Sequence, residues 1–420
     1  MDWKSDLVSE DGCFVARRGF AAEDIYRAEQ KAIFGRQWLY LGHESELRAK
    51  GDYVTTYMGE TPVIVTRGDD NAIHAFVNSC THRGLKVCLN DRGHTRLFTC
   101  PYHAWTYSTS GALMGIPQQK LIAKPTDKAA LGLKAVPRID SYRGMIFGCF
   151  DPEIAPLDAF LGNMKFYIDA YFDRFPDGLE VIGAPSKWLL SCNWKLPAEN
   201  QMGDLGHAAY LHGFFFLGSQ IMTDIERDGI NVAPEPGHGA AIRLRPPEVE
   251  QKYGDRGYSA ETNAYLAELE ARSAERLTEV QKRIDGLTYT VYPNFSILWS
   301  RDSLRIAHPR GPGKTELWSW WVTPVGAPEA VRREMQATYV GAFGPGGMVE
   351  QEDSDAWMLQ YEGSKCDHME DRPYYYGLGH GEEGAHPELP GLSGASYNEH
   401  CPRLFYKRWS DDLRATGGDQ

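Results

Sequence analysis

The amino-acid sequence predicts an α+β protein of two domains, one small and all-β, the other an antiparallel sheet covered by helices. A chain of 420 residues is too long for one ordinary hydrophobic core. Short strand-like runs between turn signals fill residues 40–155, and from residue 156 strand-like runs are followed by helical ones, as in α+β domains. We therefore assign residues 40–155 to the β domain, and residues 1–39 with 156–420 to the second domain.

The small domain is predicted from short runs of apolar and β-branched residues separated by turn residues. A short helix with apolar residues at helical spacing precedes it at Ala21–Phe34. The strands that we expect in order are Asp52–Tyr57, Pro62–Arg67, Ile73–Val77, Leu97–Thr99, Trp105–Tyr107, Ala112–Met114 and Met145–Phe150.

The second domain is predicted from a change of pattern. Val181–Ser191 is strand-like and leads into a helix near Trp194, and Ser259–Ile284 has the charge pattern of one long surface helix. A run of antiparallel strands is expected next, and two helices follow it. The strands are Leu287–Tyr292, Ser296–Ser300, Leu304–Ala307 and Glu316–Thr323, and the helices are Pro328–Tyr339 and Met348–Tyr361.

Composition excludes several classes of function. The formal net charge of −13 argues against a nucleic-acid partner, because phosphate binding needs a basic surface. Residues 1–18 have no apolar core segment typical of a signal peptide, and no stretch approaches the roughly 18 apolar residues of a membrane span. The eight cysteines are scattered, so we expect no disulfide framework and a cytoplasmic protein that binds no membrane.

The strongest motif is a pair of Cys/His clusters, Cys80-Thr81-His82 and Cys100-Pro101-Tyr102-His103, with seventeen residues between His82 and Cys100. Two such loops could clamp a metal centre between them. A single zinc ion would take all four ligands in a tetrahedron. A [2Fe-2S] cluster would give both cysteines to one iron and both histidines to the other. The β-rich setting favours the iron–sulfur cluster.

A second candidate centre surrounds His207 and His212, with Asn200 and Asp204 just before them. Five positions correspond to about 140° around a regular helix, so both rings can face one ion only across a break or a π-bulge. Two histidines and a carboxylate form the facial triad of non-haem Fe(II) oxygenases. On composition, the third ligand is open among Glu350, Glu352, Asp353 and Asp355.

These motifs resemble those of one family. The runs Cys80–Gly84 and Cys100–Trp105 resemble the cluster-binding loops of Rieske non-haem iron aromatic-ring-hydroxylating dioxygenases, and Glu199–His212 is similar to the iron-binding segment of their large (alpha) terminal oxygenase subunits. The resemblance extends from about Gly35 onward. It implies a helix-grip-like catalytic domain, a Rieske [2Fe-2S] cluster on Cys80, His82, Cys100 and His103, and mononuclear Fe(II) on His207, His212 and Asp353.

The same resemblance implies roles for other residues. Asp204 would link an iron ligand to a cluster-binding histidine of the neighbouring subunit, Asn200 would lie close to the iron, and Trp357 would lie near the substrate pocket. Phe215 belongs to an aromatic run after His212 and serves either core packing or substrate contact. Many relatives carry an aromatic residue where this chain has Gly206, which changes the expected packing beside His207.

The implied function is that of a terminal oxygenase component which uses O2 and ferredoxin-delivered electrons to hydroxylate an aromatic compound, by cis-dihydroxylation in bacterial aromatic degradation. A reductase would supply the electrons from NAD(P)H, since no dinucleotide-binding glycine fingerprint follows a strand here. Tyr397–Trp409 resembles subunits that pair with a small beta subunit, implying an alpha3beta3 assembly. Ring monohydroxylation, a Rieske electron carrier and a zinc-stabilised interaction protein are the alternatives, and the sequence does not name the substrate.

Overall fold

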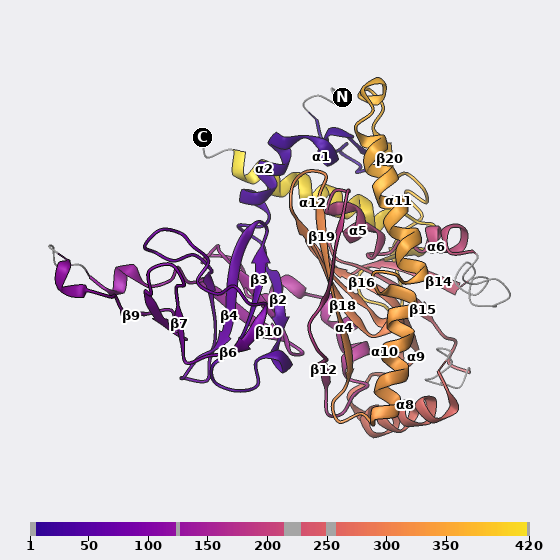
Figure 1. The fold of residues 1–420 in the computed structure, drawn as a ribbon. Helices are drawn as coiled ribbons and strands as arrows, with labels where there is room; N and C mark the ends of the chain where they lie inside the picture. The colour runs from indigo at the N-terminus through magenta and orange to yellow at the C-terminus, as the bar shows by residue number, and fades with distance from the viewer. Residues whose placement is uncertain (1–5, 123–126, 214–227, 249–257, 418–420) are drawn as a thin grey trace. The chain divides into compact units, whose positions relative to one another are not determined.

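The computed structural model describes residues 6–122, 127–213, 228–248 and 258–417, and the chain separates into two compact units (Figure 1). One unit spans Phe34–Leu157, and the other combines Met1–Ile33 with Asp158–Gln420. The sequence places the corresponding boundaries at residues 40 and 155. In the part of the chain that is described, no helix is long and apolar enough to cross a membrane.

The unit of residues 34–157 is built from three antiparallel sheets. Their strand orders are β5-β4-β3-β6, β7-β8-β9 and β10-β11-β2. The strands are β2 (Leu39–His43), β3 (Asp52–Met58), β4 (Thr61–Arg67), β5 (Ile73–Val77), β6 (Arg92–His94), β7 (Leu97–Thr99), β8 (Thr106–Ser108), β9 (Leu113–Gly115), β10 (Arg138–Tyr142) and β11 (Met145–Cys149).

The core of this unit lies directly beneath the two Cys/His loops. Ile64, Phe76 and Tyr107 are buried in one cluster, and Cys80 and Cys100 belong to the same cluster. Burial of these apolar side chains fixes the strands from which both loops start. The loops are therefore positioned by the hydrophobic core.

The larger unit contains an extended antiparallel sheet. Its strand order is β12-β19-β18-β17-β16-β15-β14-β22-β21, and β13 also pairs with β19. The strands are β12 (Leu179–Val181), β13 (Ser186–Leu190), β14 (Gly229–Ala233), β15 (Gly239–Leu244), β16 (Ile284–Val291), β17 (Phe295–Leu298), β18 (Ser303–Pro309), β19 (Thr315–Pro324), β21 (Gly384–Ala385) and β22 (Leu392–Ala395). A separate short pair joins β1 (Phe14–Val15) to β20 (Tyr374–Tyr375).

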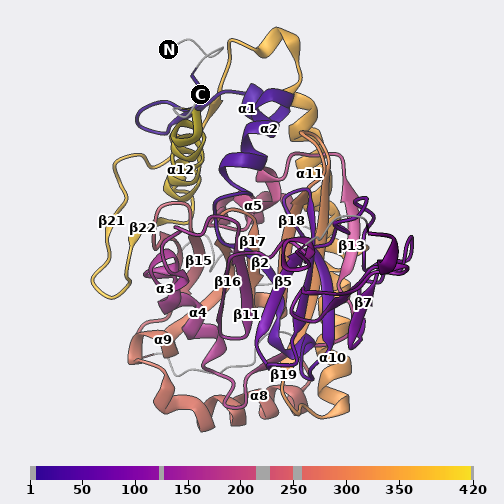
Figure 2. The ribbon, with the colours of Figure 1, turned by 90° about the vertical axis from the view of Figure 1, so that its left-hand side faces the viewer.

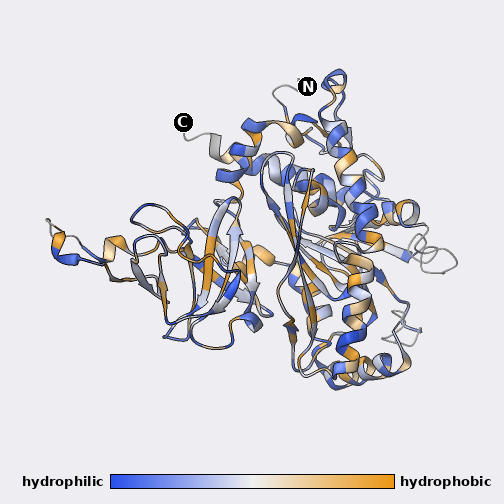
Figure 3. Ribbon diagram, in the orientation of Figure 1, coloured by the Kyte–Doolittle hydropathy of each residue, from blue (hydrophilic) through white to orange (hydrophobic). Residues whose placement is uncertain are grey.

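Helices cover this sheet, which confirms the predicted α+β class. α10 and α11 run along one side of the sheet, and α1, α2 and α12 gather at one end of it (Figures 1 and 2). Hydrophobic residues lie in the strands and are interspersed with hydrophilic ones along the helices (Figure 3). The helices are α1 (Arg18–Ala21), α2 (Glu23–Ala32), α3 (Leu157–Leu161), α4 (Met164–Phe172), α5 (Lys195–Asn200), α6 (Leu205–Leu211), α8 (Ala260–Ser273), α9 (Glu279–Arg283), α10 (Glu329–Phe343), α11 (Met348–Ser364) and α12 (His400–Gly417).

The prediction of one long helix over Ser259–Ile284 is wrong. α8 ends at Ser273, whose hydroxyl donates to the carbonyl of Leu269 at 2.9 Å. A second helix, α9, begins after Thr278, which forms a capping box with Gln281. Capping-box residues mark helix starts, so this break was visible in the sequence.

A buried carboxylate joins three distant segments of the larger unit. Glu29 of α2 accepts hydrogen bonds from Lys195 Nζ at 2.5 Å, from Trp409 Nε1 at 2.8 Å and from Trp194 Nε1 at 2.9 Å. The side chains of both Glu29 and Lys195 are fully buried. A buried charge is tolerated only when it is paired and hydrogen-bonded, and this one has a partner on each oxygen.

We expect Lys195→Met to lower the free energy of unfolding by about 3–5 kcal/mol, because it leaves the Glu29 carboxylate buried without its counter-charge. Chemical denaturation measures the change. Arg27→Ala on the same helix is the control: its pair with Glu23 is exposed, so the loss stays below about 1 kcal/mol. Equal losses in the two variants would contradict the role given to Glu29.

Candidate metal centres

The two Cys/His loops have the same backbone structure. The N–H of Cys80 donates to the carbonyl of Leu85, and the N–H of Cys100 donates to that of Trp105, each at 2.8 Å. The fourth residue after each cysteine, Gly84 or Ala104, has a left-handed φ of 76° or 54°. Repetition of this turn directs the side chains of both loops toward a common point.

The two histidines of these loops lie side by side, and the two cysteines belong to the core cluster beneath the loops. The rings of His82 and His103 lie 4.5 Å apart between centroids, and both are partly exposed, whereas Cys80 and Cys100 are buried. The ring of His82 also stacks on Trp105, with centroids 4.9 Å apart and planes 2° from parallel. The loops thus present two thiols and two imidazoles at one edge of the unit.

Several features suit these residues to a metal cluster. Nδ1 of His82 is buried and has no hydrogen-bond partner among the described residues, as expected for a nitrogen reserved for a metal. Desolvation and the neighbouring His82 lower the pKa of His103, which favours the neutral ring that metal binding needs.

Tyr107 is a residue that sequence reasoning missed. Its hydroxyl lies 3.2 Å from Cys80 Sγ and 3.0 Å from Thr81 Oγ1. Burial, together with the neighbouring thiol of Cys80, raises the pKa of Tyr107 to about 12, so the phenol keeps its proton. A neutral phenol beside a cysteine ligand can donate a hydrogen bond to its sulfur, and such bonds adjust the reduction potential of a cluster.

The second centre is built from two short helices and one long one. α5 ends at Asn200, and α6 starts after Asp204, whose side chain accepts from the N–H of His207 at 3.4 Å. α6 ends at Leu211, so His212 lies just beyond the last helical residue, with φ −96° and ψ 17°. The required break is therefore the end of the helix, and no π-bulge is involved.

The structure brings His207, His212 and Asp353 together. One ligand atom from each lies within 4.8 Å of the others. Asp353 Oδ1 is 3.2 Å from His212 Nε2 and 3.6 Å from His207 Nε2, and the two rings are 5.2 Å apart between centroids. Asp353 Oδ1 is buried and makes no hydrogen bond to any described residue, which fits an oxygen that ligates a metal. Two imidazoles and one carboxylate form the donor set of a non-haem Fe(II) centre.

The outer nitrogens of the two rings are held by other carboxylates. His212 Nδ1 is 2.7 Å from Glu352 Oε2, and His207 Nδ1 is 3.2 Å from Asp204 Oδ2. His207 Nδ1 also contacts the backbone oxygen of Asp204. With Nδ1–H donating outward, the lone pair of each Nε2 points toward Asp353. Asn200 Nδ2 lies 3.3 Å from His207 Nε2, so Asn200 also faces the centre.

Asp204 and His207 form a coupled pair. Burial alone would lower the pKa of His207, but Asp204 and Asp353 outweigh it and raise this pKa to about 9. Burial would raise the pKa of Asp204, but His207 holds it below its ordinary value. A metal ion must therefore displace a proton from His207, and the Asp204 side chain, 40% exposed, stays charged.

The structure distinguishes among the acidic residues that composition left open as the third metal ligand. Asp353 is buried among the histidines, whereas Asp355 is exposed. Glu352 contacts His212, and Glu350 is buried against Arg305 at 2.5 Å. Burial raises the pKa of Glu350 to about 7, although Arg305 opposes this shift. Glu352 and Glu350 are thus supporting residues that sequence reasoning did not distinguish from the ligand.

The remaining candidates lie as follows. Trp357 is buried one turn after Asp353 on α11, and therefore on the same face of that helix. Phe215 lies outside the described residues. A Cβ atom on Gly206 would lie 3.0 Å from Cδ1 of Tyr397, so this tyrosine occupies the space that a larger residue at position 206 would need.

Two family models match the chain. The model described as Rieske [2Fe-2S] domain matches residues 37–126, and the model described as ring hydroxylating alpha subunit (catalytic domain) matches residues 161–414. The first carries a [2Fe-2S] cluster, and the second carries mononuclear iron in this family. These are the cofactors of the chain, which rules out the zinc protein and the simple electron carrier.

Curated relatives agree over the full length. The chain is 34% identical to the benzene 1,2-dioxygenase subunit alpha of Pseudomonas putida, with 97% of this chain and 94% of the relative covered. It is 33% identical to the biphenyl dioxygenase subunit alpha of Paraburkholderia xenovorans, with 96% and 91% covered. Identity is also 33% to the large oxygenase component of the naphthalene 1,2-dioxygenase system of Pseudomonas putida, with 96% and 92% covered.

Solved structures show the same fold. The naphthalene 1,2-dioxygenase of Rhodococcus sp. with bound indole has a TM-score of 0.86 and 32% identity, and 96% of this chain and 94% of that chain are covered. Another naphthalene 1,2-dioxygenase with indole in the active site has a TM-score of 0.88 and 30% identity, with 98% and 95% covered. The chain therefore belongs to the family of Rieske-type ring-hydroxylating dioxygenase alpha subunits.

Proposed function

We propose that this chain is the large subunit of a terminal oxygenase that uses O2 and external electrons to cis-dihydroxylate an apolar aromatic compound. The observation that carries the proposal is the convergence of His207, His212 and Asp353, with one ligand atom from each within 4.8 Å of the others. Three protein ligands leave open coordination positions, as O2 chemistry requires. The relatives with full-length matches are named for benzene, biphenyl and naphthalene dioxygenation.

The residues around this centre prepare it for an ion. The carboxylates of Glu352 and Asp204 accept the Nδ1–H groups of His212 and His207, which fixes both rings and leaves each Nε2 for the metal. Trp357, on the same face of α11 as Asp353, would help to exclude water. When bound, the cluster on Cys80, His82, Cys100 and His103 supplies single electrons and the mononuclear iron supplies the site of O2 chemistry.

The names of the relatives also support a proposal for the partners of this chain. The relatives are named as subunits alpha or as the large component of a dioxygenase system. A small beta subunit in an alpha3beta3 assembly, a ferredoxin and a reductase would complete this system. The exposed carboxylate of Asp204 would then meet a cluster-binding histidine of the neighbouring subunit, and this contact would orient both rings. The protein would work in the cytoplasm, where NAD(P)H is available.

Product analysis tests the reaction. The assembled oxygenase, supplied with a ferredoxin, a reductase and NADH, is expected to convert benzene, biphenyl or naphthalene into a cis-dihydrodiol. With 18O2, both added oxygens should carry the label. A product with a single labelled hydroxyl would show that the reaction is ring monohydroxylation and not cis-dihydroxylation. The absence of product from any aromatic compound would contradict the proposal.

Asp353→Ala is expected to lower the iron content from about three to about two atoms per chain and to abolish turnover, because one ligand of the mononuclear centre is lost. The absorption spectrum of the cluster should stay unchanged. Iron analysis and the product assay measure the two effects. Asp355→Ala, two positions away and exposed, is the matched control and should behave like the wild type. Full iron content in the Asp353 variant would exclude this residue as a ligand.

Asp204→Ala is expected to keep about three irons per chain but to lower turnover by at least about tenfold to a hundredfold, since the residue supports a ligand without binding the metal. Stopped-flow oxidation of the reduced cluster, in parallel with product formation, locates the defect. Slow oxidation of an intact cluster is the expected result. Normal turnover in this variant would contradict the role given to Asp204.

Glu352→Gln is expected to weaken binding of the mononuclear iron by about tenfold to a hundredfold, because the neutral amide is a weaker acceptor for Nδ1–H of His212. Titration of the iron-depleted oxygenase with Fe(II) measures the dissociation constant. Glu352→Asp keeps the charge and should recover part of the affinity. Unchanged affinity in Glu352→Gln would show that the contact of 2.7 Å has no supporting role.

A further inference from the structure

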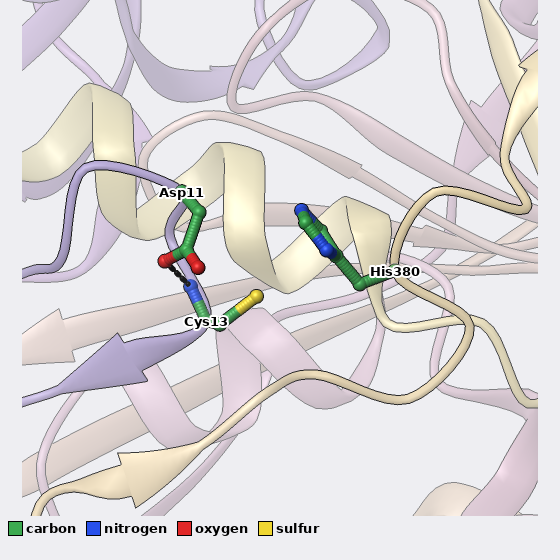
Figure 4. A group of neighbouring side chains, drawn as sticks. All are labelled: Asp11, Cys13 and His380. Carbon is green, nitrogen blue, oxygen red and sulfur yellow. Dashed lines mark hydrogen bonds between the residues drawn. The ribbon is translucent and has the colours of Figure 1, made fainter.

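A third group of metal-binding side chains lies away from both centres already described. Asp11, Cys13 and His380 converge from two segments far apart in the sequence, as Figure 4 shows. One ligand atom from each lies within 4.8 Å of the others. Cys13 is buried, whereas Asp11 and His380 are exposed, so the group opens to solvent on one side.

The N-terminal segment is folded so that Asp11 and Cys13 face the same point. The Asp11 carboxylate accepts hydrogen bonds from Ser9 Oγ at 2.6 Å and from the N–H of Cys13 at 2.9 Å. Gly12 between them has a φ of 76°, and a Cβ atom there would lie 3.2 Å from the carbonyl oxygen of Arg403. This tight turn requires glycine, and it holds the two donor side chains in place before any ion arrives.

The segment that carries His380 is anchored independently. Arg403 of α12 donates to the carbonyls of Tyr376 and Leu378 at 2.9 and 3.1 Å and pairs with Glu383 at 2.9 Å. The N–H of Tyr376 donates to the carbonyl of Cys13 at 2.7 Å, which brings the two segments together. Among the described residues, none hydrogen-bonds to the imidazole of His380, so the ring is available to a ligand.

We propose that Asp11, Cys13 and His380 bind a Zn²⁺ ion that clamps the N-terminal segment to the turn around His380. Thiolate, imidazole and carboxylate are the ligands that zinc prefers, and a site with three protein ligands keeps a fourth position for water. Ligand atoms around a tetrahedral zinc ion lie roughly 3.3–3.8 Å apart, so small rotations of the two exposed side chains close the site.

The charge of the group points to a cation. The group places the carboxylate of the exposed Asp11 beside the thiol of the buried Cys13. Metal binding displaces the thiol proton, and a divalent cation then compensates the charges of the carboxylate and of the resulting thiolate. The nearby Arg403 is already paired with Glu383.

Zinc stoichiometry tests the proposal in the assembled, iron-loaded oxygenase. After equilibration with ZnCl2 and gel filtration, the wild type is expected to hold one more zinc per chain than Cys13→Ser or His380→Gln. Cys366→Ser and His386→Gln are matched controls, because Cys366 is exposed, His386 is partly exposed and both lie outside the group; they should equal the wild type. Zinc that enters the iron centre adds equally to every variant and cancels in the comparison.

A second measurement places the ion. Anomalous diffraction at the zinc absorption edge, from crystals soaked in ZnCl2, should give a peak beside Cys13 Sγ and the imidazole of His380. Zinc is also expected to raise the melting temperature of the wild type and to leave that of His380→Gln unchanged. Equal zinc content in the wild type and both variants, or no anomalous peak at this position, would overturn the proposal.

Discussion

The carboxylate of Glu29 is the interaction on which the larger unit depends most. It is buried with Lys195, Trp194 and Trp409 as its donors, so one negative charge joins a helix near the N-terminus, the helix α5 and the C-terminal helix α12. Removal of a charge from water is tolerated only when every partner is in place. The three segments must therefore assemble together. Since α5 leads into Asn200 and Asp204, both ends of the chain determine where the iron-binding segment lies.

The ligand side chains of the two metal centres are positioned in different ways. The Cys80 and Cys100 loops are shaped by backbone hydrogen bonds and left-handed residues at matching positions. The histidines of the second centre are oriented by carboxylates, Glu352 behind His212 and Asp204 behind His207. Backbone shaping suits a compact cluster held between two loop tips. Carboxylate support suits a mononuclear ion whose ligands come from two helices, because each ring must be aimed separately.

How much of this could be predicted differs between elements. The expected strands Ile73–Val77 and Leu97–Thr99 agree with β5 and β7 at both ends, because turn residues bound short apolar runs there. Other elements could not be predicted from their pattern. Most residues of α4 are buried, so this helix lacks the polar face on which helical periodicity depends. The strands β14 and β15 are short runs that were not predicted either. All three elements were missing from the predicted architecture.

Within the candidate site, the sequence predicted which residue types bind the metal but not how these residues are arranged in space. Five positions between His207 and His212 called for a break, which the structure supplies as the end of α6. Four acidic residues remained open for the third position, and only family resemblance chose Asp353. Burial and distance now distinguish Asp353 from Glu352, which local sequence cannot do because adjacent residues on a helix point about 100° apart.

The rotation of about 100° between adjacent helical residues has an evolutionary consequence for α11. This helix starts at Met348, and Asp353 follows after little more than one turn. Insertion or deletion of a single residue between them would swing the carboxylate by about 100° and bring Glu352 or Ser354 toward the histidines. Changes of chain length between lineages should therefore accumulate in the long connection between α11 and α12. The first turns of α11 should keep a constant length even where their sequence drifts.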